Sequence, residues 1–206
     1  AVIGSETLDK ALHEAIADTF NMVSIGGNTS TNDTIAVLAN GMAENPEILP
    51  GTSEYDVFLS ALKEICKTLS KMLAKDGEGA TKLLVCKTTG AKTEEDAKKV
   101  AKGVICSTLF KAAMFGADAN WGRVLCALGY SKADVDIEKV DVAFSSKAGK
   151  VEVCKMGAGI DFSEEEAKKV LSEDEIDVLV TLRDGEYSAE AYGCDLTYDY
   201  VKINGD

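Results

Sequence analysis

A short polar stretch near the N-terminus is the first place where this sequence could bind a ligand. Residues 26–34 read Gly-Gly-Asn-Thr-Ser-Thr-Asn-Asp-Thr, which places seven polar side chains among nine residues between two apolar segments. Short hydroxyl and amide side chains can bond to neighbouring backbone groups and hold an irregular turn. They can also present donors to a ligand, but the composition alone favours a connecting loop with Asx and Ser/Thr turns.

A second candidate is the segment 76–82, in which Glu78 stands between Gly77 and Gly79 directly after an expected helix. Glycines permit unusual backbone angles and the close approach of another group. Gly77 could simply be the helix C-cap, but Gly79 is harder to explain by capping alone. A glutamate held in this way could bind the ammonium group of a ligand, and the structural and binding interpretations are equally supported. The segment lacks the Gly-x-x-x-x-Gly-Lys spacing of a phosphate loop.

The loop that contains the only Trp carries three further polar candidates, Asp118, Asn120 and Arg123. These side chains could bind a polar substrate or fix the loop against the next helix, and the structural role is the favoured interpretation. Three tyrosines are expected to be core or interface aromatics: Tyr130, Tyr198 and Tyr200.

Several catalytic arrangements are excluded because the residues or motifs that they require do not occur in the sequence. The only histidine is His13, so no Ser-His-Asp set can be assembled and a cysteine nucleophile would lack a base. The sequence has no Gly-x-Ser-x-Gly elbow and no Gly-x-Gly-x-x-Gly dinucleotide loop. No Cys-x-x-Cys pair occurs, so we expect no metal site. All six cysteines lie in apolar settings and are expected to be buried, reduced thiols: Cys66, Cys86, Cys106, Cys126, Cys154 and Cys194.

Length, composition and charge narrow the class of protein further. The 206 residues are enough to bury a core, and 46% hydrophobic with 28% charged residues is typical of a globular chain. The net charge of −13 argues against nucleic-acid binding, which depends on cations that neutralise phosphates. Because no apolar run reaches the roughly 18 residues of a membrane helix, we expect no membrane association. The N-terminus does not resemble a signal peptide.

Hydrophobic periodicity predicts the helices that must hold these candidates. An amphipathic helix is expected over residues 7–20, and a long one over 53–75 with an apolar stripe. That stripe consists of Phe58, Leu62, Ile65, Leu69 and Met72. A capping box at 93–96 predicts a helix that runs to about Met114. A short helix is expected to end near Gly129, and another to begin at Ser163.

Apolar runs and turn residues predict the strands, which are expected over 22–25, 35–39, 80–89, 140–144, 151–154, 176–182, 187–192 and 197–203. The continuous apolar run 35–39 predicts a buried strand. One hairpin is expected around Ala148-Gly149 and a second around Asp184-Gly185. The elements together predict one α/β unit over residues 1–206, with mixed β-sheets packed against long helices.

Six segments, taken in order, resemble one known family over essentially the whole chain. They are residues 19–21, 30–34, 76–82, 115–123, 127–131 and 194–204. These segments are similar to the β-chain of the glutamate/ornithine N-acetyltransferases of arginine biosynthesis. The resemblance implies a self-processing, N-terminal-nucleophile type of acetyltransferase fold, in which a precursor cuts itself into α and β chains. The two chains are then expected to form an α2β2 assembly in the cytoplasm.

The resemblance also implies the chemistry. Acetyl passes from N-acetylornithine to an N-terminal Thr hydroxyl of the β-chain and then to glutamate, and the free amine of that Thr supplies the base. The oxyanion hole belongs to the α-chain. No resident cofactor is implied, although acetyl-CoA could serve as a second acetyl donor.

Two residues carry over as substrate-binding groups. Glu78 matches a substrate-binding Glu and is expected to contact the substrate ammonium, and Asn204 matches a substrate-binding Asn. Residues 28–34 are expected to support the site, without a catalytic role. The family's Thr and two apolar residues precede the position of Ala1, and its chain usually extends a few residues beyond Asn204. The sequence as given is therefore expected to bind substrate without turning it over.

Two other functions remain open at this point. A related self-processing aminopeptidase or amidohydrolase would send the acyl group to water. A metabolite-binding or purely structural domain would have no second chain and no transfer activity.

Overall fold

The computed structural model describes residues 1–205, and their contacts separate the chain into two compact units. The smaller unit consists of Ala1–Asn21 and Asn28–Ser70, and the larger consists of Met22–Gly27 and the chain from Lys71 onward. We expected one α/β unit over residues 1–206, and whether the two compact units act as one domain stays a prediction.

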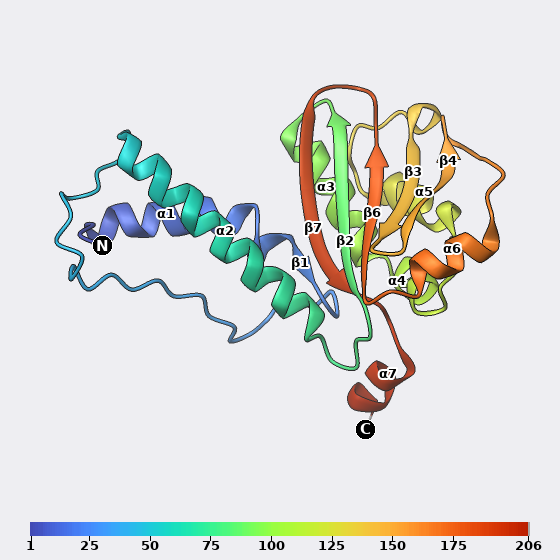
Figure 1. Cartoon of the computed structure of the whole chain (residues 1–206), viewed down its shortest axis with the longest axis horizontal. Coiled ribbons are helices and arrows are strands. Elements are labelled where there is room, and N and C mark those ends of the chain that lie inside the picture. The colour runs from blue at the N-terminus through green and yellow to red at the C-terminus, as the bar shows by residue number, and fades with distance from the viewer. Residues whose placement is uncertain (206) are drawn as a thin grey trace. The chain divides into compact units, whose positions relative to one another are not determined.

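A mixed sheet forms the frame of the larger unit (Figure 1). Within residues 1–205 its strands are β1 (Val23–Ser24), β2 (Leu83–Ala91), β3 (Asp141–Ser146), β4 (Gly149–Lys155), β5 (Ala158–Gly159), β6 (Glu175–Thr181) and β7 (Tyr187–Cys194). Their order across the sheet is β1-β7-β2-β6-β3-β4-β5. The pairs β1–β7 and β2–β6 are parallel and the other neighbours are antiparallel, which confirms the predicted mixed α/β class.

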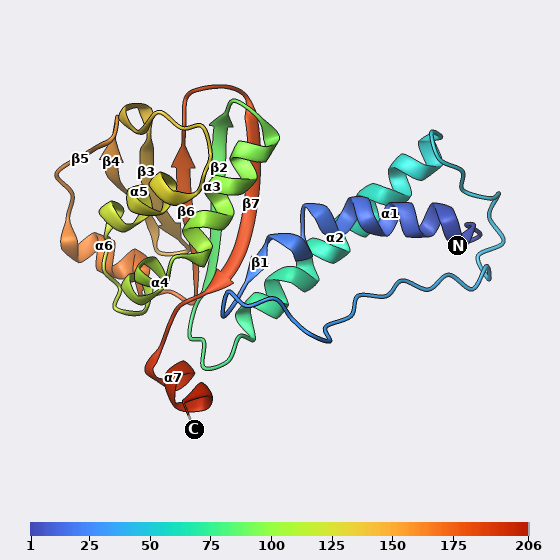
Figure 2. The ribbon, with the colours of Figure 1, turned by 180° about the vertical axis from the view of Figure 1, so that it is seen from behind.

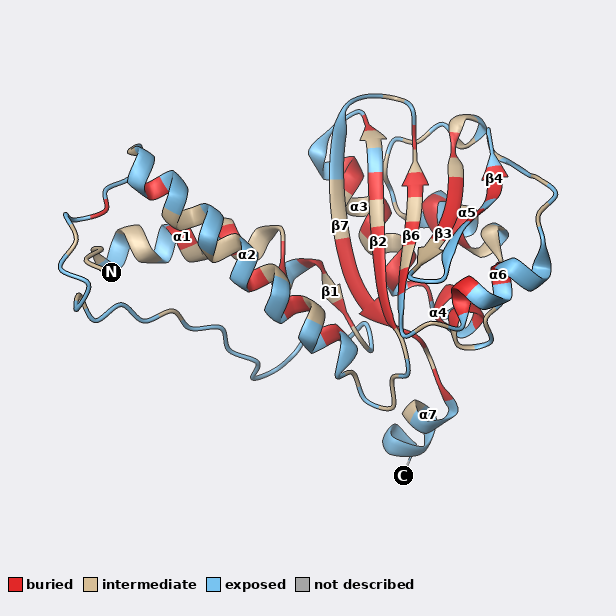
Figure 3. Ribbon diagram, in the orientation of Figure 1, coloured by how far each residue is buried: buried red, intermediate tan, exposed pale blue. Residues whose placement is uncertain are grey.

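Helices cover one face of this sheet. They are α3 (Glu94–Cys106), α4 (Thr108–Phe115), α5 (Trp121–Tyr130) and α6 (Glu164–Leu171), with 3₁₀ turns at Phe20–Met22 and Ile137–Lys139. Figure 2 shows α3, α4 and α5 in front of the sheet, where α3 contacts β2 and β7. Strand β6 alternates buried and half-buried residues, so its buried side faces the helices and its other side is partly accessible. Figure 3 shows the buried residues concentrated on the strands and the helix faces against them.

The smaller unit contains α1 (Ser5–Ala17) and most of α2 (Ser53–Lys75). Its core is a small cluster of Ala11, Ile48 and Tyr55. The boundaries of the long helix were predicted correctly, and its apolar stripe is only partly covered within the described residues. Phe58 and Leu62 pack against the small cluster, whereas the side chains further along the stripe are exposed: Ile65, Leu69 and Met72. Periodicity identifies an apolar face, but it does not show which part of that face another element covers.

Capping residues explain where the helices of the larger unit begin. The side chains of Thr93 and Ser163 accept hydrogen bonds from the backbone three residues later, as the two capping boxes predict. The single helix expected from this first box to about Met114 is wrong, because it ends at Cys106. Ser107 has an extended backbone and its side chain caps the separate helix α4 by accepting from Phe110 N.

Two of the expected strands are absent from residues 1–205. The run 35–39 has no strand pairing, and Ile35 and Leu38 are 40% and 94% exposed. A strand requires a neighbouring ladder as well as an apolar run, and no described strand pairs with this segment. The expected final strand over 197–203 is the helix α7 (Tyr198–Asn204), because Thr197 caps it by accepting a hydrogen bond from Tyr200 N.

The hairpin around Ala148-Gly149 is confirmed as β3–β4, whereas the second expected hairpin is wrong. Strands β6 and β7 do not pair, because β2 lies between them in the sheet. The connection through Asp184-Gly185 instead crosses the end of β2, where Asp184 N donates to Gly90 O at 2.8 Å. The Asp184-Gly185 pair therefore predicted the loop correctly, but the prediction that the two flanking strands pair with each other was wrong.

The cysteines and tyrosines are only partly as expected. All six cysteines are free thiols, but Cys106 and Cys126 are exposed and the other four are buried. Burial raises the pKa of the Cys86 thiol to about 12, so this group stays protonated in the folded chain. Tyr130 and Tyr198 are 55% and 76% exposed, so neither is a core aromatic, and an interface role for them stays a prediction.

Candidate functional site

The two residues expected to bind substrate lie side by side in the larger unit. Asn204, in the last turn of α7, donates from Nδ2 to Glu78 Oε2 at a distance of 2.8 Å. Glu78 lies in the turn between α2 and β2, 126 positions earlier in the chain. Both side chains are exposed. The fold therefore brings the predicted pair together at an accessible position, while their role in binding stays a prediction.

The hydrogen bonds of this pair decide what it can bind. Asn204 Nδ2 also donates to Tyr200 O at 3.0 Å, so both of its hydrogens have acceptors and the orientation of the amide is fixed. Among residues 1–205, no donor reaches Glu78 Oε1 or Asn204 Oδ1. The two open positions are both hydrogen-bond acceptors and one belongs to a carboxylate. This arrangement suits an ammonium group, which has only donors.

Glycines allow the Glu78 turn to approach the C-terminal helix closely. Gly79 has a φ of +66°, in the left-handed region that a side chain disfavours. A Cβ at this position would lie 2.6 Å from Tyr200 N and 2.9 Å from Asp199 C. A Cβ on Gly77 would lie 2.9 Å from Cys194 Sγ. Both glycines are thus explained by close packing, which the sequence alone could not separate from helix capping.

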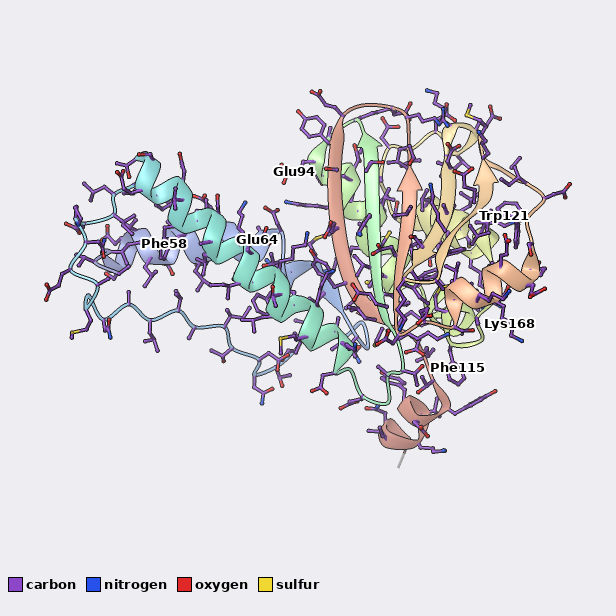
Figure 4. The ribbon with its side chains drawn as sticks, viewed as in Figure 1. Phe58, Glu64, Glu94, Phe115, Trp121 and Lys168 are labelled. Carbon is purple, nitrogen blue, oxygen red and sulfur yellow. The ribbon has the colours of Figure 1, made fainter. Side chains whose placement is uncertain are left out.

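Three further contacts hold α7 in place. Thr197 Oγ1 donates to Gly79 O at 2.7 Å and ties the start of α7 to the Glu78 turn. The ring of Tyr198 packs edge-to-face against Phe115, with 5.5 Å between ring centroids. Figure 4 shows Phe115 near the end of the sheet from which the chain continues into α7. Tyr200 brings its hydroxyl so close to Gly26 that a Cβ there would lie 2.8 Å from the oxygen.

A buried carboxylate anchors the other end of the Glu78 turn. Asp195, 2% exposed, accepts hydrogen bonds from Thr81 N at 2.8 Å, from Lys82 N at 3.0 Å and from Thr81 Oγ1 at 2.5 Å. The Lys82 ammonium donates to Met114 O and Leu171 O, near the C-termini of α4 and α6, where a cation is favoured. Burial lowers the pKa of Lys82, and the charge of Asp195 opposes that shift.

A second lysine, Lys111, is buried near Cys194. Lys111 in α4 is 5% exposed, and its ammonium donates to Ile25 O just after β1. Burial raises the pKa of the nearby Cys194 thiol, while the positive charge of Lys111 opposes the shift. Lys111 therefore links α4 to the residue that follows β1.

Replacing Gly79 by Ala tests whether close packing at the turn sets the site. The backbone strain costs about 1–2 kcal/mol, and the new Cβ must push α7 away because it meets Tyr200 N. We expect a lower melting temperature and weaker substrate binding. Gly129→Ala is the matched control, because a Cβ meets nothing within 4 Å at that helical position. The control is expected to hold or raise stability by up to about 1 kcal/mol. Equal behaviour of the two variants in thermal melts would contradict the packing argument.

The polar residues around the only Trp have the structural role that was favoured. Asn120 caps α5 by accepting from Arg123 N at 3.3 Å, and its amide donates to Asp118 at 3.1 Å. The Arg123 guanidinium donates to Leu109 O at 2.6 Å and fixes the loop to α4. Trp121 packs against β5 so closely that a Cβ on Gly159 would lie 2.4 Å from its ring.

The polar stretch 28–34 belongs to the smaller unit and is exposed throughout. Ser30 Oγ accepts hydrogen bonds from Asn32 N and Asp33 N, at 3.2 and 2.9 Å. This is the local Ser/Thr turn that composition favoured. A supporting role for the segment at a substrate site stays a prediction.

Asp195 and Thr197 were not singled out from the sequence, although the segment 194–204 was. An N-cap signal was present, because Thr197 directly precedes the helix that it caps. Asp195 gave no local signal, since its partners Thr81 and Lys82 lie more than a hundred residues away. Among the described residues, no group of three or more His, Cys, Asp or Glu side chains could hold a metal ion. In the same part of the chain, no helix is long and apolar enough to cross a membrane.

Comparison with known proteins gives one consistent result. The sequence profile of the ArgJ family matches residues 1–206. The arginine biosynthesis bifunctional protein ArgJ 1 of Clostridium acetobutylicum is 53% identical over 205 residues, covering 100% of this chain and 50% of that protein. The corresponding protein of Caldanaerobacter subterraneus subsp. tengcongensis is 52% identical, covering 100% of this chain and 51% of its own length. The chain thus spans about half the length of these relatives.

A solved structure agrees with the sequence relatives. The crystal structure of the arginine biosynthesis bifunctional protein argJ from Bacillus halodurans superposes with a TM-score of 0.94 at 43% sequence identity. The superposition covers 100% of this chain and 95% of the chain in that crystal structure. The similarity therefore extends from sequence to the arrangement of the whole α/β fold.

Proposed function

The chain belongs to the ArgJ family, and from that premise we propose that it is the β-chain of an acetyltransferase that moves acetyl from N-acetylornithine to glutamate. The observation that carries this proposal is the Glu78–Asn204 pair, which offers two free acceptors to an ammonium group. N-acetylornithine has a free side-chain ammonium, because its acetyl group occupies the α-nitrogen. Glu78 is the residue proposed to bind it.

The proposed reaction has two steps. A threonine hydroxyl, which by the family resemblance precedes the position of Ala1, attacks the acetyl carbonyl carbon of N-acetylornithine. The C–N bond breaks, and ornithine leaves with a proton on its amine. The unprotonated α-amine of glutamate then attacks the acetyl ester, which breaks the ester bond and returns the proton to threonine. No resident cofactor takes part, and acetyl-CoA is a second donor to be tested.

The complete enzyme is proposed to contain a companion α-chain from the same precursor, as an α2β2 assembly in the cytoplasm. The chain spans about half the length of its relatives, which leaves room for such a companion. The companion would supply the oxyanion hole, which stabilises the negative oxygen of each tetrahedral intermediate.

The test is an acetyl-transfer assay on the enzyme produced from its full-length precursor. The enzyme is incubated with N-acetylornithine carrying a ¹³C-labelled acetyl group, with and without glutamate, and products are identified by mass spectrometry. Labelled N-acetylglutamate is the expected product. Labelled acetate in place of N-acetylglutamate would identify a hydrolase, and unchanged substrate would favour a binding domain. Labelled acetyl-CoA in a parallel reaction decides whether that donor is also used.

A further inference from the structure

The hydroxyl of Thr197 connects the two halves of the candidate site. This residue is 4% exposed, and Oγ1 donates to Gly79 O at 2.7 Å while it accepts from Tyr200 N at 3.1 Å. One atom thus caps the helix that carries Asn204 and also holds the turn that carries Glu78. A threonine hydroxyl has one donor and two acceptor positions, so it can serve both partners at once.

The helix α7 has few other supports. It is seven residues long, and within the described chain none of its residues is buried. Isolated helices of this length are unstable in water, because each new helix must first form a costly hydrogen-bonded turn. The position of Asn204 therefore depends on the anchoring of the first turn of α7. Thr197 supplies the hydrogen-bonded part of that anchor, and the packing of Tyr198 on Phe115 supplies an apolar part.

We propose that Thr197 is a positioning residue for the substrate site. Its hydroxyl fixes the register between the Glu78 turn and α7, so that Glu78 Oε1 and Asn204 Oδ1 converge on one substrate ammonium. Thr197 acts through Glu78 and Asn204 and does not itself touch the substrate. This inference rests on the proposed acetyl transfer from N-acetylornithine.

Four substitutions test the two hydrogen bonds of the Thr197 hydroxyl, one that caps α7 and one to Gly79 O. Thr197→Val keeps the shape but leaves Gly79 O and Tyr200 N without their partner. Thr197→Ser keeps both hydrogen bonds. Thr197→Asp can still cap α7, because Asp is a strong N-cap residue, but its carboxylate cannot donate to Gly79 O. Glu78→Gln removes the charge through which Thr197 is proposed to act.

Steady-state kinetics of the complete enzyme test the proposal, with kcat and KM measured for N-acetylornithine. Thr197→Val is expected to raise KM about tenfold with a smaller change in kcat, and Thr197→Ser to stay within about twofold of wild type. Thr197→Asp is expected to raise KM although its added negative charge would by itself attract the ammonium. In the Glu78→Gln background, Thr197→Val is expected to raise KM by a smaller factor than in the wild type, because the Glu78 charge is already absent and only the Asn204 contact remains to be displaced.

Independent effects would overturn the proposal. If Thr197→Val raises KM by the same factor with and without Glu78→Gln, then Thr197 does not act through Glu78. If Thr197→Val lowers only kcat, or if Thr197→Asp has wild-type KM, the Gly79 hydrogen bond does not position the site. Should Thr197→Val fail to fold, the Ser and Asp variants give the same decision. A wild-type enzyme without transfer activity would instead refute the proposed function.

Discussion

Glu78→Gln is expected to raise KM for N-acetylornithine by about 10- to 100-fold, the range typical of losing a hydrogen bond to a charged group. The substitution keeps the shape and one acceptor oxygen but removes the negative charge. Asn204 holds Oε2 of Glu78, so the other oxygen is the one that faces the ligand. An uncharged amide can also turn its NH₂ group towards the ligand. The partial positive charge of that NH₂ group would then repel the ammonium. The expected loss is therefore in binding more than in turnover.

The two proposed substrates provide an internal comparison for this variant. N-acetylornithine carries a side-chain ammonium, whereas glutamate carries a side-chain carboxylate. We expect KM for N-acetylornithine to rise more than KM for glutamate, measured separately in the two-step reaction. Glu186→Gln is the matched control, because Glu186 is an exposed loop residue outside the site. An unchanged KM for N-acetylornithine in Glu78→Gln would refute the assignment of Glu78 to the ammonium.

Asp195→Ala is expected to destabilise the folded enzyme by about 3–5 kcal/mol. The substitution leaves two partly buried backbone N–H groups and the Thr81 hydroxyl without their acceptor. It also removes the negative charge nearest to the half-buried Lys82 ammonium. For a chain of this size the loss corresponds to a fall of about 6–20 °C in melting temperature, measured by circular dichroism or differential scanning fluorimetry.

Asp195→Asn provides the control for this prediction. The amide oxygen can still accept from Thr81 N and Lys82 N, and the Thr81 hydroxyl can rotate to accept from the new NH₂ group. We expect a fall in melting temperature that is less than half of that in Asp195→Ala. If both variants have the melting temperature of the wild type, the buried carboxylate does not anchor the Glu78 turn.

The features that were predicted correctly depend on neighbours in the sequence. Thr93 and Ser163 were identified as caps because a cap bonds to the backbone three residues further on. The β3–β4 hairpin was identified because its turn and both strands lie within fifteen residues. Local patterns carry this information fully, since no distant segment takes part in the contact.

The wrong assignments depend on segments that are distant in sequence. The turn at Asp184-Gly185 suggested a hairpin, but β2 occupies the position between β6 and β7. The run 35–39 is apolar, yet no described strand pairs with it. The segment 197–203 was predicted to be a strand, while the cap at Thr197 and the packing of Tyr198 on Phe115 produce a helix.

Patterns along the chain were enough to predict the α/β class, most of the helices and, through six ordered segments, the family. They also identified Glu78 and Asn204 as separate candidates. The three-dimensional fold was needed to show that they meet, which atoms they leave free, and that Thr197 and Asp195 bond to the turn that carries Glu78. The physical reason is that these contacts join residues more than a hundred positions apart, so their geometry is set by the sheet and by the close packing at Gly79.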